Sequence, residues 1–276
     1  MPRELFHVPF GQRPETLGSQ IEGSNLIIPR EFTLDEVGHF YITDIVRHRI
    51  ARFSSAGKYQ MELRYVPTAR QIFAHPDAHQ NLWLLLSDPM RGFYYGVYDV
   101  HARQRRGGLF SQFNQFRLHL DDHAVLHVIA SSDKNVAATA SFLFDEDSLL
   151  LKKEAVGPPP LTHHEIRKND HTYFTDPLPG SKTGESVTTQ ITDESHRPIS
   201  SIQGAVIYTT DQGDLYTRAT ACQINVYEAD GTFKGSVHLT GLPSSCASIR
   251  FDTDGNIYQL DGDTSGMRLV QWEREN

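Results

Sequence analysis

Residues 252–261 read Asp-Thr-Asp-Gly-Asn-Ile-Tyr-Gln-Leu-Asp, an Asp/Gly turn followed by a short strand of alternating apolar and polar residues. Two other stretches have the same form, Leu-Asp-Glu-Val-Gly-His-Phe-Tyr-Ile-Thr-Asp at 34–44 and Thr-Asp-Gln-Gly-Asp-Leu-Tyr at 210–216. A turn rich in Asp and Gly beside alternating segments is typical of a β-hairpin. The pattern therefore predicts a sheet protein built from repeated hairpins.

The repeat continues along the whole chain with a nearly constant period. One apolar or aromatic residue marks the same strand position in each copy, and these markers are Tyr41, Trp83, Leu126, Tyr173, Tyr216 and Tyr258. The intervals between them are 42, 43, 47, 43 and 42 residues. A fixed period of this length, with several strands per unit, indicates a β-propeller. We therefore predict an all-β, six-bladed β-propeller with four-stranded antiparallel blades.

The whole chain, 1–276, is predicted to form a single domain. The predicted blades span approximately 25–65, 66–110, 111–156, 157–203, 204–242 and 243–276. The last blade has only three strands, which would leave an exposed edge. The segment Glu-Leu-Phe-His-Val-Pro at 4–9 is predicted to supply its outer strand, with Leu5 and Val8 as apolar cover. This N-terminal strand would close the ring.

The first unit also resembles a known repeat. Its sequence at 35–59, DEVGHFYITDIVRHRIARFSSAGKY, is similar to the NHL repeat: Asp-x-x-Gly, an apolar strand ending in Asp, a short loop, an Arg-apolar strand and a Gly turn. The segments 211–235 and 252–273 resemble it less closely. The resemblance implies a six-bladed, TolB-like propeller. That superfamily includes binding scaffolds, lactonases and lyases, so the resemblance does not choose the function.

Composition narrows the classes of partner. The chain has 26 basic and 34 acidic residues, a net charge of −8, which opposes nonspecific binding of nucleic acid. The one basic run, at 103–106, is expected to be a solvated turn. No apolar stretch approaches the ~20 residues that cross a bilayer, so no membrane insertion is expected. The first seven residues do not read as a signal peptide, and we expect a cytoplasmic protein or a trimmed exported one.

Candidate ligand-binding residues lie on one predicted face. In a propeller, the loops between second and third strands share a face with the connections between blades, around the mouth of the central channel. Such a concave ring of polar side chains is where a ligand would bind. The residues predicted to bind it are Arg30, Arg47, His48, Arg70, Asn114, His163, His164, Asp176 and Arg218.

Some polar residues on this face recur from blade to blade and others do not. A repeated Asp that follows a strand is expected to accept hydrogen bonds from its own loop, and the copies are Asp44, Asp88, Asp133, Asp176 and Asp261. Arg49 begins a strand and is expected to be structural. Arg47 and His48 do not recur, so they are better candidates for a functional role than the repeated Asp residues, although a solvated loop is favoured over function.

Two groups of histidines were weighed as metal ligands. His119, His123 and His127 are spaced by four, but they span a strand, a turn and a strand, so they form no helical metal face. His163 or His164 with Asp176 is the better candidate for a metal or a general base. His171 belongs to the opposite end of its strand.

The gluconolactonase branch of six-bladed propellers binds a divalent metal through Glu, Asn and Asp. Within that resemblance, Asn114 and Glu165 are candidate members of the ligand set, although no local motif frames them. We therefore expect no cofactor, with a divalent metal as the alternative.

The sequence as a whole favours a non-catalytic binding scaffold that recognises a protein or a small-molecule ligand through the channel-mouth face. The first alternative is a metal-assisted hydrolase or lyase with its site at the same mouth. A second alternative is a structural module of a larger exported protein. The scaffold is favoured because the sequence shows a clear structural repeat but no complete set of catalytic residues.

The two cysteines map to one face of adjacent blades. Cys222 precedes the predicted third strand of the fifth blade, and Cys246 precedes the inner strand of the sixth. A disulfide requires Cα atoms within about 7 Å. The lateral offset between an inner and a third strand, at about 4.8 Å per strand, favours two separate buried thiols. The alternative is a disulfide, which would indicate an oxidising compartment.

Overall fold

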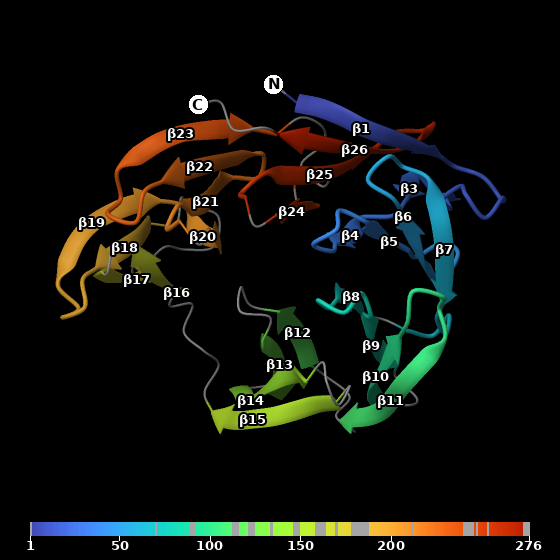
Figure 1. Ribbon diagram of the computed structural model, residues 1–276, viewed down its shortest axis with the longest axis horizontal. Helices are drawn as coiled ribbons and strands as arrows, with labels where there is room; N and C mark the ends of the chain where they lie inside the picture. Colours follow the sequence, from blue (N-terminus) through green and yellow to red (C-terminus); the bar gives the residue numbers. More distant parts are fainter. Residues whose placement is uncertain are drawn as a thin grey trace. The chain divides into compact units, whose positions relative to one another are not determined.

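A computed structural model describes residues 2–272 with several gaps. The positions outside the description are 1, 70, 89–91, 112–115, 121–124, 133–134, 146–149, 158–163, 169–170, 178–187, 211, 240–245, 247, 253 and 273–276. The described residues form an all-β structure with six four-stranded sheets and one two-stranded sheet (Figure 1). The strand pairings with a defined register are antiparallel, as in hairpin 40–53. This arrangement is consistent with the predicted β-propeller.

The chain divides into two compact units. One comprises residues 4–159 and 260–270, and the other comprises 1–3, 160–259 and 271–276. A sheet of order β1–β26–β25–β24 is formed by segments from the two ends of the sequence. Its strands are β1 (Pro2–Pro9), β24 (Ile249–Phe251), β25 (Ile257–Gly262) and β26 (Gly266–Trp272).

The larger unit contains three consecutive four-stranded sheets. The first sheet has the strands β4 (Glu31–Leu34), β5 (Phe40–Asp44), β6 (Arg49–Phe53) and β7 (Tyr59–Arg64). The second has β8 (Gln71–Pro76), β9 (Leu82–Asp88), β10 (Gly92–Tyr98) and β11 (Gln104–Ser111). The third has β12 (Phe116–Leu120), β13 (Val125–Ser132), β14 (Asn135–Asp145) and β15 (Leu150–Gly157). Each sheet is a meander in which sequential strands pair.

The core of this unit lies where the first two sheets pack together. Every residue of β5 and β6 is buried. Tyr41 and Ile50 from these strands form one cluster with Leu82, Leu84 and Leu86 of β9. The central strands β5 and β6 are therefore fully buried, although they include polar and charged residues, whereas the outer strand β7 mixes exposed and covered positions.

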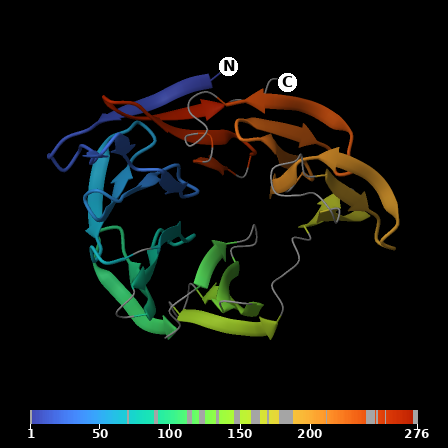
Figure 2. The same ribbon diagram turned by 180° about the vertical axis from the view of Figure 1, so that it is seen from behind.

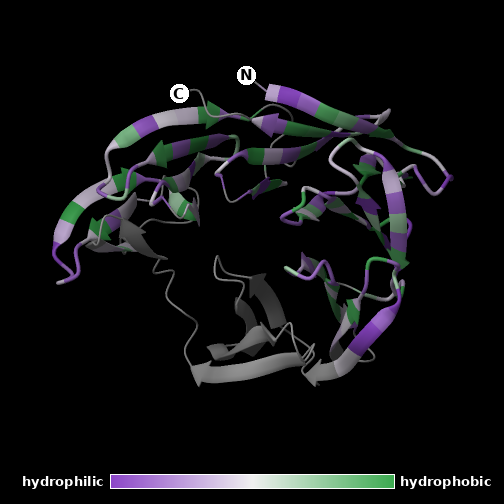
Figure 3. Cartoon of the chain, viewed as in Figure 1, coloured by the Kyte–Doolittle hydropathy of each residue, from purple (hydrophilic) through white to green (hydrophobic). Residues whose placement is uncertain are grey.

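The smaller unit contains two complete four-stranded meanders. The first has β16 (His164–Lys168), β17 (His171–Pro177), β18 (Thr188–Thr192) and β19 (Pro198–Gln203). The second has β20 (Ala205–Thr209), β21 (Leu215–Thr220), β22 (Gln223–Tyr227) and β23 (Phe233–His238). Ile191, Ile202, Leu215 and Tyr227 join these sheets in one buried cluster. The outer strands β19 and β23 mix hydrophilic and hydrophobic residues, as the colours in Figure 3 show.

The aromatic marker of the repeat has a physical role. The Tyr41 hydroxyl donates to the carboxylate of Asp35, six residues earlier, at 3.1 Å. The Trp83 indole N–H donates in the same way to the Asp77 carboxylate at 2.9 Å. Tyr258 repeats the bond to Asp252, also at 2.9 Å. The Asp carboxylates also accept backbone N–H groups of their own turns, so one carboxylate fixes both the turn and the buried ring.

A short hairpin precedes the first meander. Its strands, β2 (Gln20–Glu22) and β3 (Asn25–Ile27), form the separate two-stranded sheet. Ile21 on this hairpin is 76% exposed. The sequence analysis did not predict the hairpin, because its strands have only three residues each and no repeat marker.

The N-terminal strand β1 pairs with β26, as predicted, and Figures 1 and 2 show the two strands side by side from both directions. The buried residues of β1 are Phe6 and Val8. Leu5, which was expected to provide cover, is only half-buried. The Phe6 ring lies 5.6 Å from that of Phe40 and 6.1 Å from that of Phe53, measured between centroids.

We expect Phe6→Ala to lower the free energy of unfolding by about 3 to 5 kcal/mol, because it removes a buried ring that joins β1 to the first sheet. Glu4→Ala, at an exposed position of the same strand, should change stability by less than about 0.5 kcal/mol. Denaturant unfolding of the two variants measures both values. Equal stabilities would show that β1 is not held by this contact.

Half-buried His75 predicts a dependence of the free energy of unfolding on pH. Burial lowers the pKa of this imidazole from 6.5 to about 4, and nearby Asp77 opposes the shift only in part. The folded state therefore keeps His75 neutral at pH values where the unfolded chain binds a proton. Stability is fully present above about pH 6.5 and falls as the pH drops toward 4, by about 3 kcal/mol from this residue.

Urea unfolding of the wild type and of His75→Gln, at about pH 7.5 and about pH 4, isolates this contribution from other titrating groups. The wild type should lose more stability than the variant over this interval. An identical loss in both proteins would mean that His75 is protonated equally in the folded and unfolded states.

Candidate functional site

Two predicted site residues of the larger unit, Arg47 and His48, lie in the loop that carries a buried ion pair. Asp44 ends β5 and Arg49 begins β6, and the two residues are direct partners in the antiparallel register. The Arg49 Nε donates to Asp44 Oδ2 at 3.0 Å, with both side chains at most 1% exposed. Arg49 also pairs with Glu62. Buried charges persist only when they are paired and hydrogen-bonded in this way.

This ion pair holds the irregular segment 12–18 against the sheet. The Arg49 guanidinium donates to the carbonyl oxygens of Pro14, at 2.9 Å, and of Thr16. Asp44 Oδ2 accepts the backbone N–H of Gly18 at 3.1 Å. A side chain on Gly18 would lie 2.8 Å from Asp44 Oδ1, so only glycine permits this approach.

Arg47 strengthens the same attachment. Its Nη1 donates to the carbonyl oxygens of Arg13, at 2.7 Å, and Thr16, at 2.9 Å, and its Nη2 donates to that of Gln12 at 3.1 Å. We call Asp44, Arg47 and Arg49 the loop clamp. Most of the hydrogen bonding of Arg47 therefore serves segment 12–18, and its role in ligand binding stays a prediction.

Other predictions for this unit have mixed outcomes. Asp44 accepts the backbone N–H of Arg47 at 3.3 Å, within its own loop as expected, in addition to its bonds outside the loop. The structural role expected for Arg49 is confirmed. His48 is half-buried with a φ of 52°, and its carbonyl oxygen accepts the N–H of Tyr65. Arg30 is exposed.

The carboxylate of Glu62 is partly exposed and pairs with Arg49 of the loop clamp. Burial acts to raise its pKa, but hydrogen bonds from Arg49 and Arg64 outweigh burial and lower the pKa below its usual value. Glu62 therefore stays ionised beside the two guanidinium groups. Its contribution to stability is present at neutral pH and is lost only as the pH falls through its lowered pKa.

We expect Arg49→Ala to lower the free energy of unfolding by about 3 to 5 kcal/mol, because it leaves the Asp44 carboxylate buried without its charged partner. Arg13→Ala, which removes a side chain that is 83% exposed, should cost less than about 0.5 kcal/mol. Thermal and urea unfolding measure both effects. Similar values for the two variants would contradict a structural role for the buried pair.

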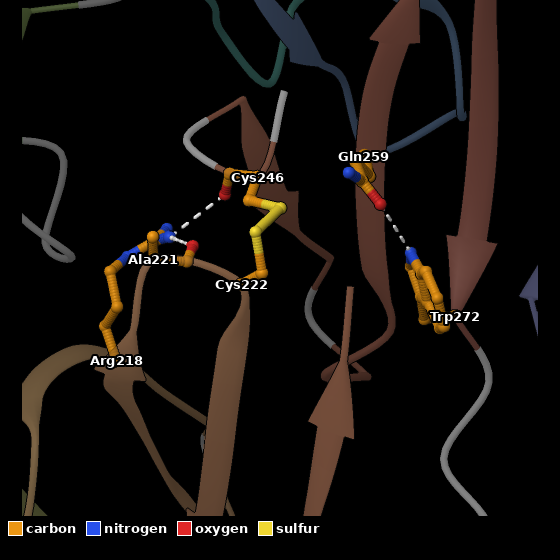
Figure 4. Close-up of a disulfide and its surroundings, with 6 residues drawn as sticks. All are labelled: Arg218, Ala221, Cys222, Cys246, Gln259 and Trp272. Carbon is orange, nitrogen blue, oxygen red and sulfur yellow. Dashed lines mark hydrogen bonds between the residues drawn. A yellow bond between two sulfur atoms is a disulfide. The ribbon is translucent and has the colours of Figure 1, made fainter. Parts of the chain in front are cut away.

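In the smaller unit, the predicted site residue Arg218 lies beside a disulfide (Figure 4). Cys222, in the turn after β21, is bonded to Cys246, which precedes β24, with a Cα–Cα distance of 5.1 Å. Arg218 Nη1 donates to the carbonyl oxygens of Ala221 and Cys246, both at 2.9 Å. Burial lowers the pKa of Arg218.

The expectation of two separate thiols is therefore wrong. Cys222 and Cys246 lie beyond the ends of their strands, in connections that approach each other, so the lateral spacing of the strands does not separate them. The expected common face for the two cysteines was correct. Adjacent segments bring together residues that are 24 positions apart in the sequence.

We expect Cys222→Ser with Cys246→Ser to lower the free energy of unfolding by about 3 kcal/mol, as expected for opening a loop of this length. A thiol assay of denatured, unreduced protein should detect no free thiol. Reduced wild type should unfold like the double variant. Two reactive thiols in unreduced protein would contradict the bond.

Several predicted site residues cannot be located in full. Arg70, Asn114 and His163 lie outside the described residues, as does Asp133, and Asp176 and His164 are described only as backbone. In the β16–β17 pairing, His164 is opposite Thr175, the neighbour of Asp176, whereas His171 is opposite Lys168. The expected placement of His171 at the other end of the strand is therefore confirmed.

A shallow cavity that the sequence analysis missed lies in the smaller unit. It has a volume of about 320 Å³, and its lining consists of Thr172, Tyr173, Asp193, Glu194, Ser195, Arg197 and Ile199. Glu194 Oε1 accepts the Thr172 N–H at 3.0 Å, and Asp193 pairs with Arg197 at 3.1 Å. Its polar groups thus already bind one another, within the β18–β19 turn and between that turn and β17.

Two features are absent from the described part of the chain. It contains no group of three or more His, Cys, Asp or Glu residues placed to hold a metal ion. The described residues include no helix that is long enough and apolar enough to cross a bilayer.

No protein-family model matches this chain, and no curated protein matches it either. Among solved structures, it is similar to a luciferin-regenerating enzyme, with 13% identity, 89% of this chain and 91% of that chain covered, and a TM-score of 0.49. A glucose dehydrogenase is 11% identical over 100% of both chains, with a TM-score of 0.49. Virginiamycin B lyase from Staphylococcus aureus is 14% identical, with 88% and 80% covered and a TM-score of 0.40. Likeness at this level assigns neither a family nor an activity to the chain.

Proposed function

We propose that the chain is a non-catalytic binding scaffold, a six-bladed propeller closed by its N-terminal strand, that recognises a protein or another ligand through its loop-rich face. One observation carries the proposal. In each compact unit, an arginine in or near the connection between the second and third strands of a meander donates to carbonyl oxygens of irregular backbone. These residues are Arg47, after β5, and Arg218, near the end of β21.

Loops held in this way are suited to recognition. A binding surface made of loops is most effective when a rigid framework fixes the loops before the ligand arrives, because less conformational entropy is lost on binding. The fully buried strands β5 and β6 provide such a framework for segment 12–18. The outer surface of that segment is available, since Gln12, Arg13, Pro14 and Glu15 are exposed.

The metal-assisted hydrolase or lyase stays the alternative. Its predicted residues are His163, His164 and Asp176, whose side chains lie outside the description. The two functions make different demands on a purified sample. A metal-assisted enzyme requires a stoichiometric divalent ion and turnover, whereas a scaffold requires a saturable ligand.

The test combines three measurements on the disulfide-intact protein. Elemental analysis after gel filtration should find no stoichiometric divalent ion, and p-nitrophenyl acetate should not be hydrolysed above the background rate with or without added metal. Immobilised protein should enrich specific sequences from a displayed random-peptide library. A stoichiometric ion together with hydrolysis would replace the scaffold by the enzyme.

Variants then identify the binding face. Changing Arg47 and His48 together to Ala should lower the affinity for the enriched peptides by at least about tenfold, which corresponds to about 1.4 kcal/mol of binding free energy. Arg105→Ala with Arg106→Ala, exposed residues on β11, is the matched control and should leave affinity unchanged. Because Arg47 also holds segment 12–18, thermal unfolding must accompany the comparison. An equal loss from the β11 pair would show that a different face binds.

A further inference from the structure

Arg218 has one side of its guanidinium group unused. A guanidinium carries five N–H donors, one on Nε and two on each Nη. The two on Nη1 are accounted for by the carbonyl oxygens of Ala221 and Cys246, each at 2.9 Å. In the described part of the chain, no carboxylate forms an ion pair with Arg218. Among the described residues, the adjacent Nε and Nη2 donors therefore have no protein partner.

The same edge is occupied in other arginines of this protein. The Nε of Arg49 donates to Asp44, that of Arg103 to Asp99 and that of Arg197 to Asp193, at 2.9 to 3.1 Å. In each case a carboxylate from a nearby turn or strand end satisfies the guanidinium. Arg218 lies within β21, and its sequence neighbours, Thr217 and Ala219, supply no acid.

Hydrogen bonds to two segments that a disulfide joins hold the Arg218 guanidinium in place. Ala221 is adjacent to Cys222, and Cys222 is bonded to Cys246, so both carbonyl partners of Nη1 belong to segments joined by the disulfide. Figure 4 shows the guanidinium extending from β21 toward these segments. The Cys222 carbonyl oxygen in turn accepts the N–H of Leu239 at 2.8 Å. An anion would thus meet a donor edge that is already oriented.

The partial burial of Arg218 favours the binding of an anion at the edge formed by Nε and Nη2. Arg218 is half-buried, and burial disfavours its charged form, as its lowered pKa indicates. Partial exposure leaves a route from solvent. A half-buried cation without a counter-ion is stabilised by any anion that reaches it with good geometry.

We infer that Arg218 is an anion-binding residue that receives a carboxylate group of the ligand in a bidentate pair on its Nε and Nη2 donors. This inference rests on the proposed binding function and specifies its ligand chemistry. The planar guanidinium edge matches the spacing of the two carboxylate oxygens, and such pairs are stronger than neutral hydrogen bonds. A peptide carrying a free carboxylate, or a small carboxylic acid, has the required group.

The experiment follows the Nε–H resonance of Arg218 by ¹H–¹⁵N NMR in the disulfide-intact protein. The probes are N-acetylalanine, which carries a carboxylate, and N-acetylalanine amide, which has the same size without the charge. The carboxylate should shift the resonance saturably, and the amide should not. Inorganic phosphate and chloride serve as competing anions, and the carboxylate should bind more tightly than either.

Two charge-conserving variants complete the test. Arg218→Lys keeps the positive charge but removes the bidentate edge, and it should weaken N-acetylalanine by at least about tenfold. Arg106→Lys, at an exposed position on β11, should have no effect. Unfolding curves establish that Arg218→Lys is folded. The comparison of N-acetylalanine with N-acetylalanine amide uses only the wild type, so it does not depend on the folding of any variant.

Three results would overturn the inference: no saturable shift with the carboxylate, an equal shift with the amide or with chloride, or unchanged affinity in Arg218→Lys. None of these would affect the proposed scaffold function, because the peptides in that test are selected without regard to a carboxylate and are tested on Arg47 and His48. Conversely, a failure of peptide enrichment would leave a saturable shift at Arg218 intact.

Discussion

The buried pair of Asp44 and Arg49 is the constraint on which the first sheet and its neighbouring loop depend. Two charges with at most 1% exposure would be strongly unfavourable alone, so each must keep its partners. Those partners include the backbone of segment 12–18 as well as the other charge. A conformational change in this segment would therefore strip hydrogen bonds from buried ions, and this cost makes one loop conformation dominant.

A second use of carboxylates explains why the repeat is visible in the sequence. Asp35, Asp77 and Asp252 each accept backbone N–H groups of a turn and a polar hydrogen of the aromatic ring six residues later. The spacing between the Asp and the ring is thus set by hydrogen-bond geometry. Aromatic residues without this polar hydrogen would fill the same volume but leave the carboxylate less satisfied.

These local rules also explain which predictions succeeded. Turn chemistry and strand alternation are properties of a few consecutive residues, so the strand predicted at 4–9 is found as β1 and the stretch 34–44 contains a turn followed by β5. The role of Arg47 and the bond between Cys222 and Cys246 depend on where distant segments cross, which no local pattern contains. The free edge of Arg218 was likewise invisible, because it follows from which carbonyl groups the fold places beside Nη1.

The disulfide has a consequence for the integrity of the chain. It joins the turn after β21 to the segment before β24, and therefore encloses all of β22 and β23 in a covalent loop. A single peptide-bond cleavage anywhere between the two cysteines would not release either fragment. The nicked protein would migrate as one species until it is reduced, and the backbone on both sides of the cut would stay at high effective concentration for its own sheet.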